Sequence, residues 1–412
     1  MSDFTATIRD HLKQAREAQV GFLAALVQEP SDNPPGDCQA HAERAAALLE
    51  GLGLSVERHR VPAATVKKAG MIAATNLVLR KTFGEGPTIA LNAHGDVVPP
   101  GTGWTKAPYG AEIVDGWMYG RGVAVSKSDF ATYTYALLAL QAAAAAGAKL
   151  KGTVELHFTY DEEAGGEIGP RWLIEQGLTK PDLCIGAGFS YSVVTAHNGC
   201  LHLEVMVSGK SAHAAMPFTG HDALEATTAI LTALYDWRKR LADTVSKIEG
   251  IGSPQCTVGL IEGGINTNVV PDRVTFRLDR RMIPEENPEE VERVLRDLIE
   301  GAARNYQGIK VSVQRVLLAR PLLPLDGGRQ ITERLCARAS EVMGEPIGAK
   351  GVPLYTDARH YTAAGIPTVL YGAGPRSIEE ANAHRADERL PLADLAKATE
   401  VVALTLYDLL NA

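Results

Sequence analysis

Three features that would narrow the class of this 412-residue protein are scarce or missing: paired cysteines, long apolar runs and an excess of basic charge. The five cysteines show no Cys-x-x-Cys spacing, which argues against a disulfide framework or a thiolate zinc site and favours a reducing compartment. No window approaches the roughly 18 apolar residues of a membrane span, and the N-terminus lacks the apolar core of a signal peptide. We therefore expect a soluble, cytoplasmic protein with no membrane partner.

The charge balance and the length set two further limits. Lys and Arg number 41 against 49 Asp and Glu, a formal net charge of −8, and no basic stripe is visible, so nucleic acid is not expected as a partner. A chain of this length is too long for one ordinary core, so two domains are expected.

Strands alternate with helices as far as about residue 190, which predicts an α/β domain with a largely parallel sheet. The runs TNLVLR (75–80) and TIALNAH (88–94) are typical strands, and AEIVDGWMYG (111–120) has the Asp-Gly of a hairpin. Ligands gather beyond the carboxyl ends of strands in such sheets, and NAHGD and TYDEE stand at positions of that kind.

The middle of the chain has a different order of strand, helix, two strands, helix and strand, which predicts a split βαβ sandwich. We expect an inserted second domain at 198–312, and a catalytic α/β domain made of 1–197 and 313–412.

Three short segments carry residues suited to chemistry. In His94-Gly-Asp96 a histidine at a strand end is followed by a carboxylate that can orient its ring, although a polar loop is the plainer interpretation. In Asp161-Glu162-Glu163 neighbouring carboxylates point in different directions, so one can bind a metal while the next accepts a proton. His384 is informative only together with these residues.

Five motifs in order resemble the acetylornithine deacetylase, succinyl-diaminopimelate desuccinylase, aminoacylase and carboxypeptidase G family of zinc hydrolases. The motifs extend over essentially the whole chain; they are NAHGDVVPPGTGWTKAPYGAEIVDGWMYGRG, TYDEEAGG, VSGKSAHAAMP, GGINTNVVPD with LDRR, and NAHRADE. The resemblance implies a zinc-peptidase-like catalytic domain and a lid domain through which the chain forms a homodimer.

The resemblance also implies roles for individual residues. His94 would bind one zinc with Asp96 orienting it, Glu162 would be the general base, and Glu163 and His384 would bind the other zinc.

The remaining implied residues would act on substrate. In the lid domain His213 would stabilise the oxyanion, and Asn268 and Arg281 would hold the amide and carboxylate of a small-molecule substrate. The backbone near Gly372 and Gly374 would line the same pocket. A guanidinium suits a carboxylate, but Arg281 is also placed to pair with Asp279 or Glu285.

Two expected zinc ligands are absent. Val125 stands in YGRGVAVSK where the family has the aspartate that bridges both ions, and Ala187 or Gly188 stands where it has a further acid. Neither half of a conventional two-zinc site is complete.

Three hypotheses remain. One zinc or other divalent ion per subunit is held by His94, Glu163 and His384; or Asp129, one helical turn from Val125, substitutes as a ligand; or the site is metal-free. Ser126, Ser128 and Asp129 either contact substrate or, as we expect, cap the next helix.

We therefore expect a hydrolase that cleaves an amide-type bond of a small carboxylate-bearing substrate, such as an N-acyl amino acid or a short peptide, with Glu162 as general base. The alternatives are a metal-independent hydrolase or lyase using the same pocket, and an inactive small-molecule-binding protein.

Overall fold

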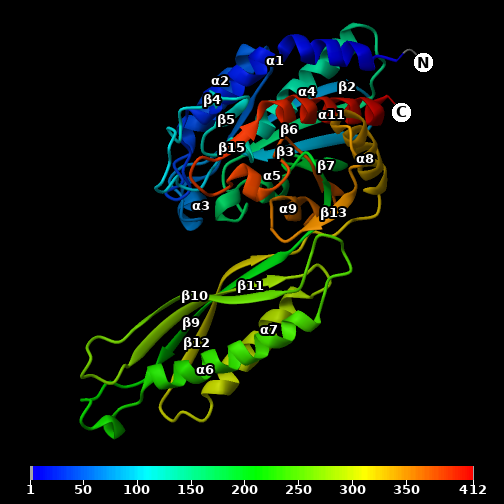
Figure 1. The fold of residues 1–412 in the computed structure, drawn as a ribbon. Helices are drawn as coiled ribbons and strands as arrows, with labels where there is room; N and C mark the ends of the chain where they lie inside the picture. Colours follow the sequence, from blue (N-terminus) through cyan, green and yellow to red (C-terminus); the bar gives the residue numbers. More distant parts are fainter. Residues whose placement is uncertain (1–2, 412) are drawn as a thin grey trace. The chain divides into compact units, whose positions relative to one another are not determined.

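The computed structural model describes residues 3–411, which divide into two compact units (Figure 1). Among the described residues, the first unit comprises 3–195, 324–350 and 356–411, and the second comprises 196–323 and 351–355. The second unit therefore extends beyond the 198–312 expected from the sequence, and it includes a short later segment. Within residues 3–411, no helix combines the length and the apolar composition that crossing a membrane requires.

The first unit is built on a mixed sheet of eight strands in the order β1-β2-β6-β3-β7-β14-β8-β13. Its strands are Glu57–Arg60 (β1), Thr75–Gly84 (β2), Thr88–His94 (β3), Gly152–Thr159 (β6), Leu183–Gly186 (β7), Val193–His197 (β8), Ala349–Val352 (β13) and Thr368–Leu370 (β14). The four central strands β6, β3, β7 and β14 are parallel, whereas β2 runs antiparallel to β6 and β8 antiparallel to β14. The predicted α/β class is confirmed.

The parallel register brings two strand ends together. His94 in β3 pairs with Thr159 in β6, so NAHGD and TYDEE leave the sheet side by side. The loops that carry the expected chemistry therefore meet at the carboxyl edge of the sheet, as the rule for parallel sheets predicts.

Helices cover this sheet. They are Thr5–Val27 (α1), Gln39–Gly51 (α2), Ala63–Lys68 (α3), Lys127–Ala145 (α4), Pro170–Glu175 (α5), Arg329–Met343 (α8), Ala358–Ala363 (α9), Ile378–Ala381 (α10) and Leu392–Leu410 (α11). In Figure 1, α4 lies beside α1 and α11, and both neighbours contact it. Helix α4 is buried almost all round, because its alanines allow close approach to its neighbours.

A small three-stranded sheet, β15-β5-β4, lies beside the main one. Its strands are Glu112–Val114 (β4), Trp117–Tyr119 (β5) and Arg389–Pro391 (β15). The turn between β4 and β5 is Asp115-Gly116, with φ of 50° and 79°, as in the hairpin turn that Asp-Gly favours.

The second unit is an antiparallel sheet in the order β10-β11-β9-β12, with two long helices packed on it. Its elements are Gly199–Ser208 (β9), Ala223–Arg238 (α6), Gln255–Gly263 (β10), Arg273–Met282 (β11), Pro288–Ala303 (α7) and Lys310–Ala319 (β12), with the short turns Pro217–Thr219 (η2) and Lys239–Asp243 (η3). Alternate residues of β9, such as Leu201 and Leu203, enter the core below the helices. This is the predicted split βαβ order.

A buried polar network supports β6, the strand that leads to the acidic turn. The carboxylate of Glu155 accepts hydrogen bonds from Arg80 Nε (2.8 Å) and Thr179, and it contacts His157 Nε2 (2.9 Å). Burial raises the pKa of Glu155, but these bonds outweigh it and lower the pKa from 4.5 to about 2.

A carboxyl group with a lowered pKa stabilises the fold above the pKa of the unfolded chain, and this contribution is lost as the pH falls toward the folded value. For Glu155 the loss between about pH 6 and pH 3 is about 2 kcal/mol. We expect Glu155→Gln to be less stable than wild type at pH 6, with the difference shrinking by that amount at pH 3. Urea unfolding measures both. The exposed Glu175→Gln is the control, and a constant difference would contradict the prediction.

Candidate active site

Asp96 joins the two strand-end loops. Its fully buried carboxylate accepts hydrogen bonds from Asn33 Nδ2 (2.9 Å) and from the backbone N–H groups of Glu162 (3.2 Å) and Glu163 (3.1 Å). Three donors compensate a buried charge that would otherwise be very costly. The position of the acidic turn is therefore set by the loop after β3.

His94 lies at the centre of the site. Its Nδ1 is 3.0 Å from the backbone oxygen of Asp96 and 3.4 Å from Asp96 Oδ1, and its Nε2 is 3.9 Å from Glu162 Oε2. Burial lowers the pKa of His94, but the carboxylates of Glu162 and Asp96 outweigh burial and raise it well above the usual value. The contact on Nδ1 leaves Nε2 directed toward the acidic turn.

Ser126 holds the backbone of His94. Its Oγ accepts a hydrogen bond from the backbone N–H of His94 (2.8 Å) and donates to the backbone oxygen of the same residue (3.1 Å). The expectation that Ser126 caps the next helix is wrong, because it occupies the N-cap position without a capping bond. Ser128 likewise donates to the backbone oxygen of Ala124 (2.9 Å).

Glu162 and Glu163 form a single 3-10 turn, Glu162–Ala164 (η1), after β6. The donor atoms of His94, Glu162 and Glu163 all lie within 4.8 Å of one another. Burial and the nearby carboxylates of Glu163 and Asp96 raise the pKa of Glu162 to about 8 against the opposing effect of His94.

His384 joins this group through Glu163, with Nε2 3.4 Å from Glu163 Oε1 and a side chain that is 65% exposed. The hydrogen bond to Glu163 raises the pKa of His384. His384 has a φ of 60°, a conformation that a non-glycine residue adopts only at a cost. The loop before β15 thus holds the imidazole at the acidic turn.

A cavity of about 50 Å³ lies within the first unit, at the carboxyl end of β3. Its lining includes His94 and Glu162 together with Val125, Ala187 and Asp357. Asp357 was not predicted from the sequence; it is buried, and its Oδ2 has no hydrogen-bond partner. Burial, and then the charge of Glu162, raise the pKa of Asp357 well above its usual value.

The donors present fit a divalent ion. An imidazole and carboxylates are zinc ligands, and Oδ2 of Asp357 is a buried oxygen without a hydrogen-bond partner that a cation at the cavity would satisfy. Val125 and Ala187 line the same cavity but carry no donor atom. The group of three includes Glu162 beside the predicted ligands His94 and Glu163.

Asp129 has a different setting. It is fully buried, and its Oδ1 accepts a hydrogen bond from the backbone N–H of Ala373 (2.8 Å). A side chain on Gly372 would lie 2.0 Å from the same oxygen, and Gly374 bonds through its N–H to the Gly188 oxygen (3.0 Å). The contacts of Asp129 tie the loop after β14 to α4, and the bond from Gly374 to Gly188 ties it to the loop after β7. A substrate role for the two glycines stays a prediction.

The expected lid residues lie in the second unit. His213 and Asn268 are exposed, and their two loops pair through the Ala214 N–H and the Asn268 oxygen (3.0 Å). The guanidinium of Arg281 donates to Asp279 through Nε (3.0 Å) and Nη2 (3.1 Å), the partner that the sequence also suggested.

The comparison with known families shows what this fold and site belong to. Residues 90–408 match the model of Peptidase family M20/M25/M40, so the chain belongs to this family. It is 29% identical over 369 residues to an acetylornithine deacetylase of Myxococcus xanthus, covering 87% of this chain and 89% of that protein. It is 26% identical over 394 residues to a succinyl-diaminopimelate desuccinylase of Wolinella succinogenes, covering 93% and 97%.

Solved structures agree at the level of the fold. An M20 family metallo-carboxypeptidase from Sulfolobus solfataricus has a TM-score of 0.75 at 18% identity and covers 95% of this chain and 99% of its own. An aminopeptidase from Bacillus cereus has a TM-score of 0.72 at 22% identity and covers 96% and 98%. The resemblance seen in the motifs is confirmed, and the chain is an amidohydrolase- or peptidase-like enzyme of a metal-dependent family.

Because three donors bind the carboxylate of Asp96, Asp96→Asn should place an amide NH₂ against at least one N–H donor. We expect the free energy of unfolding to fall by about 2–4 kcal/mol, as measured by urea unfolding. The matched control is Asp115→Asn on the exposed hairpin turn, where asparagine tolerates the positive φ. Equal stability of the two variants would show that Asp96 does not hold the loops together.

Proposed function

We propose that this enzyme hydrolyses an amide-type bond of a small carboxylate-bearing molecule, an N-acyl amino acid or a short peptide. The observation that carries the proposal is the convergence of His94, Glu162 and Glu163 at the carboxyl edge of the sheet, fixed by Asp96. The names of the relatives, a deacetylase and a desuccinylase of N-acylated amino acids, support this substrate class.

The residues of the first unit would have different roles in the reaction. Glu162 accepts the proton of the attacking water and delivers it to the departing amine, the general acid–base role that a carboxylate beside the reacting atoms performs. Asp96 positions both His94 and the acidic turn. His94, Glu163 and His384 would hold one divalent ion, zinc or another metal. A bound ion of this kind supplies Lewis acidity at the substrate carbonyl.

The second unit would supply the groups for the rest of the substrate. His213 would donate to the developing oxyanion, Asn268 to the amide, and Arg281 would bind the carboxylate. Arg281 already holds the carboxylate of Asp279, so a substrate carboxylate would share or take over those donors. Gly372 and Gly374 would line the pocket. We also propose that the protein forms a homodimer through the lid domain and is located in the cytoplasm.

Two other functions remain as alternatives. A metal-independent hydrolase or lyase is favoured by Val125 and Ala187, which remove donors from the cavity. A small-molecule-binding protein without activity would also preserve the pocket. Elemental analysis of protein purified without chelator distinguishes the metal-independent enzyme from the proposed metal-dependent one. A panel of N-acetyl and N-succinyl amino acids and dipeptides distinguishes the inactive binding protein from an enzyme.

Glu162→Gln should lower kcat by at least about 100-fold with little change in KM, because the amide keeps the shape but cannot accept the proton. Steady-state kinetics on the most active panel substrate measures this effect. Glu175→Gln, an exposed change on α5, is the matched control. Equal rates in Glu162→Gln and wild type would remove Glu162 as the base.

Adding donors at the apolar positions should create the second ion site. We expect Val125→Asp combined with Ala187→Glu to raise the metal content by about one ion per chain over wild type, because both side chains line the cavity. Ala187 is preferable to Gly188, where an added Cβ would lie 3.0 Å from the Tyr371 backbone nitrogen. Val125→Asn with Ala187→Gln keeps the shapes without the charges. Unchanged metal content in the acidic variant would contradict the prediction.

A further inference from the structure

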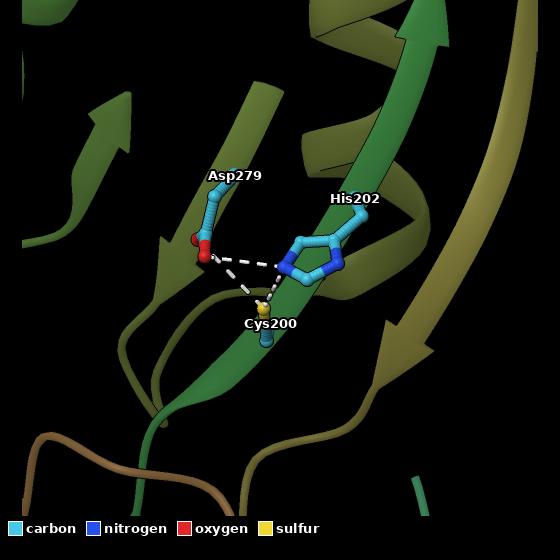
Figure 2. A group of neighbouring side chains, drawn as sticks. All are labelled: Cys200, His202 and Asp279. Atoms are coloured by element: carbon cyan, nitrogen blue, oxygen red, sulfur yellow. Dashed lines mark hydrogen bonds and ion pairs between the residues drawn. The ribbon is translucent and has the colours of Figure 1, made fainter. Parts of the chain in front are cut away.

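A second group of donor side chains lies in the other unit, on the sheet of β9 and β11. Cys200 and His202 are two residues apart in β9 and therefore share a face, and Asp279 of β11 is paired directly with His202. Figure 2 shows the three side chains pointing toward one another. Cys200 Sγ is 3.2 Å from His202 Nε2 and 3.7 Å from Asp279 Oδ1, and His202 Nε2 is 3.1 Å from Asp279 Oδ2.

The position of this group on the sheet is well defined. Leu201 and Leu203, which alternate with Cys200 and His202 along β9, enter the core below α6 and α7. The group of three therefore occupies the opposite face of the sheet. Cys200 is fully buried, whereas the side chains of His202 and Asp279 are 34% and 32% exposed. The ladder fixes the spacing of the three Cα atoms, and the exposed side leaves a route for a further ligand.

The geometry does not fit a thiol activated by a histidine and a carboxylate. In such a relay the carboxylate contacts the ring nitrogen opposite the one that faces the nucleophile. Here sulfur and carboxylate both approach Nε2, which has only one hydrogen to donate. A cation among the three atoms would satisfy sulfur, nitrogen and oxygen together.

The separations match a tetrahedral metal. Bonds of about 2.0–2.3 Å at tetrahedral angles place sulfur, nitrogen and oxygen donors about 3.3–3.6 Å apart, against the 3.1–3.7 Å present. Thiolate and imidazole select zinc-like transition metals over Mg²⁺ or Ca²⁺. Arg281 donates to the Asp279 carboxylate and orients it, as residues behind metal ligands commonly do.

We propose that Cys200, His202 and Asp279 form a binding site for one zinc-like divalent transition-metal ion, which shares no ligand with the ion site proposed at His94. The sulfur binds as thiolate, and its proton passes to solvent when the ion enters. Three protein ligands leave one position open for water or a small anion, as in exchangeable and catalytic zinc sites.

Cobalt(II) titration of the full chain tests the site, because a thiolate ligand gives a near-ultraviolet charge-transfer band that nitrogen and oxygen ligands do not. The cavity at His94 offers only nitrogen and oxygen, so its occupancy does not produce this band. We expect one equivalent of the band in wild type and in Cys336→Ala. Cys200→Ala should abolish the band, and His202→Ala should weaken cobalt binding at this site at least 100-fold.

Circular dichroism verifies that each variant folds, and His202→Ala provides the test if Cys200→Ala does not. Glu163→Gln should keep the sulfur band even when it loses activity and metal at the active site, which separates the two proposals. Absence of the band in wild type, or its survival in Cys200→Ala, would overturn the site.

Discussion

The buried carboxylate of Asp96 is the constraint on which the rest of the site depends. It is held by Asn33, from the segment after α1, and by the backbone of the acidic turn. A carboxylate at this depth is stable only if its donors stay in place. Since those donors belong to the turn that carries Glu162 and Glu163, the same bonds that compensate the buried charge also fix the proposed base and ligand.

The buried carboxyl groups around the cavity suit the binding of a cation. Asp96, Asp161, Glu162 and Asp357 are buried or largely buried, and the imidazole of His94 and the buried guanidinium of Arg359 supply opposing charge. Burial raises the pKa of Asp161 and Asp357 well above the usual value. Such groups take up protons or a cation. Carboxylates in place of Val125 and Ala187 would add two further negative charges and justify a second ion. With both positions apolar, the cavity lacks these charges.

Much of this was predictable from the sequence, for physical reasons that also set the limits. Strand patterns and the parallel-sheet rule placed His94 beside the acidic turn, and the strand and helix order predicted the second unit. Ser126 contacts His94, and Asp357 lines the cavity beside it, although these residues lie far apart in the chain. The periodicity of the sequence cannot predict contacts of this kind. Likewise, alternation places Cys200 and His202 on one face, but only the register of β9 against β11 brings Asp279 to them. For Arg281 the sequence left substrate and Asp279 as alternatives, because both offer a carboxylate.

The backbone of the loop that carries Val125 does not depend on a charged side chain at that position. The loop is held on both sides of Val125 by groups other than its side chain. Ser126 bonds the backbone of His94, and Lys127 donates to the Glu29 oxygen (2.9 Å). Glu388, which pairs with Arg121 (2.6 Å), accepts a hydrogen bond from the Ala124 N–H. Since none of these bonds uses the residue at 125, a carboxylate and a valine fit the same backbone. The residue at 125 therefore affects the charge of the cavity and not the contacts that hold this loop against His94.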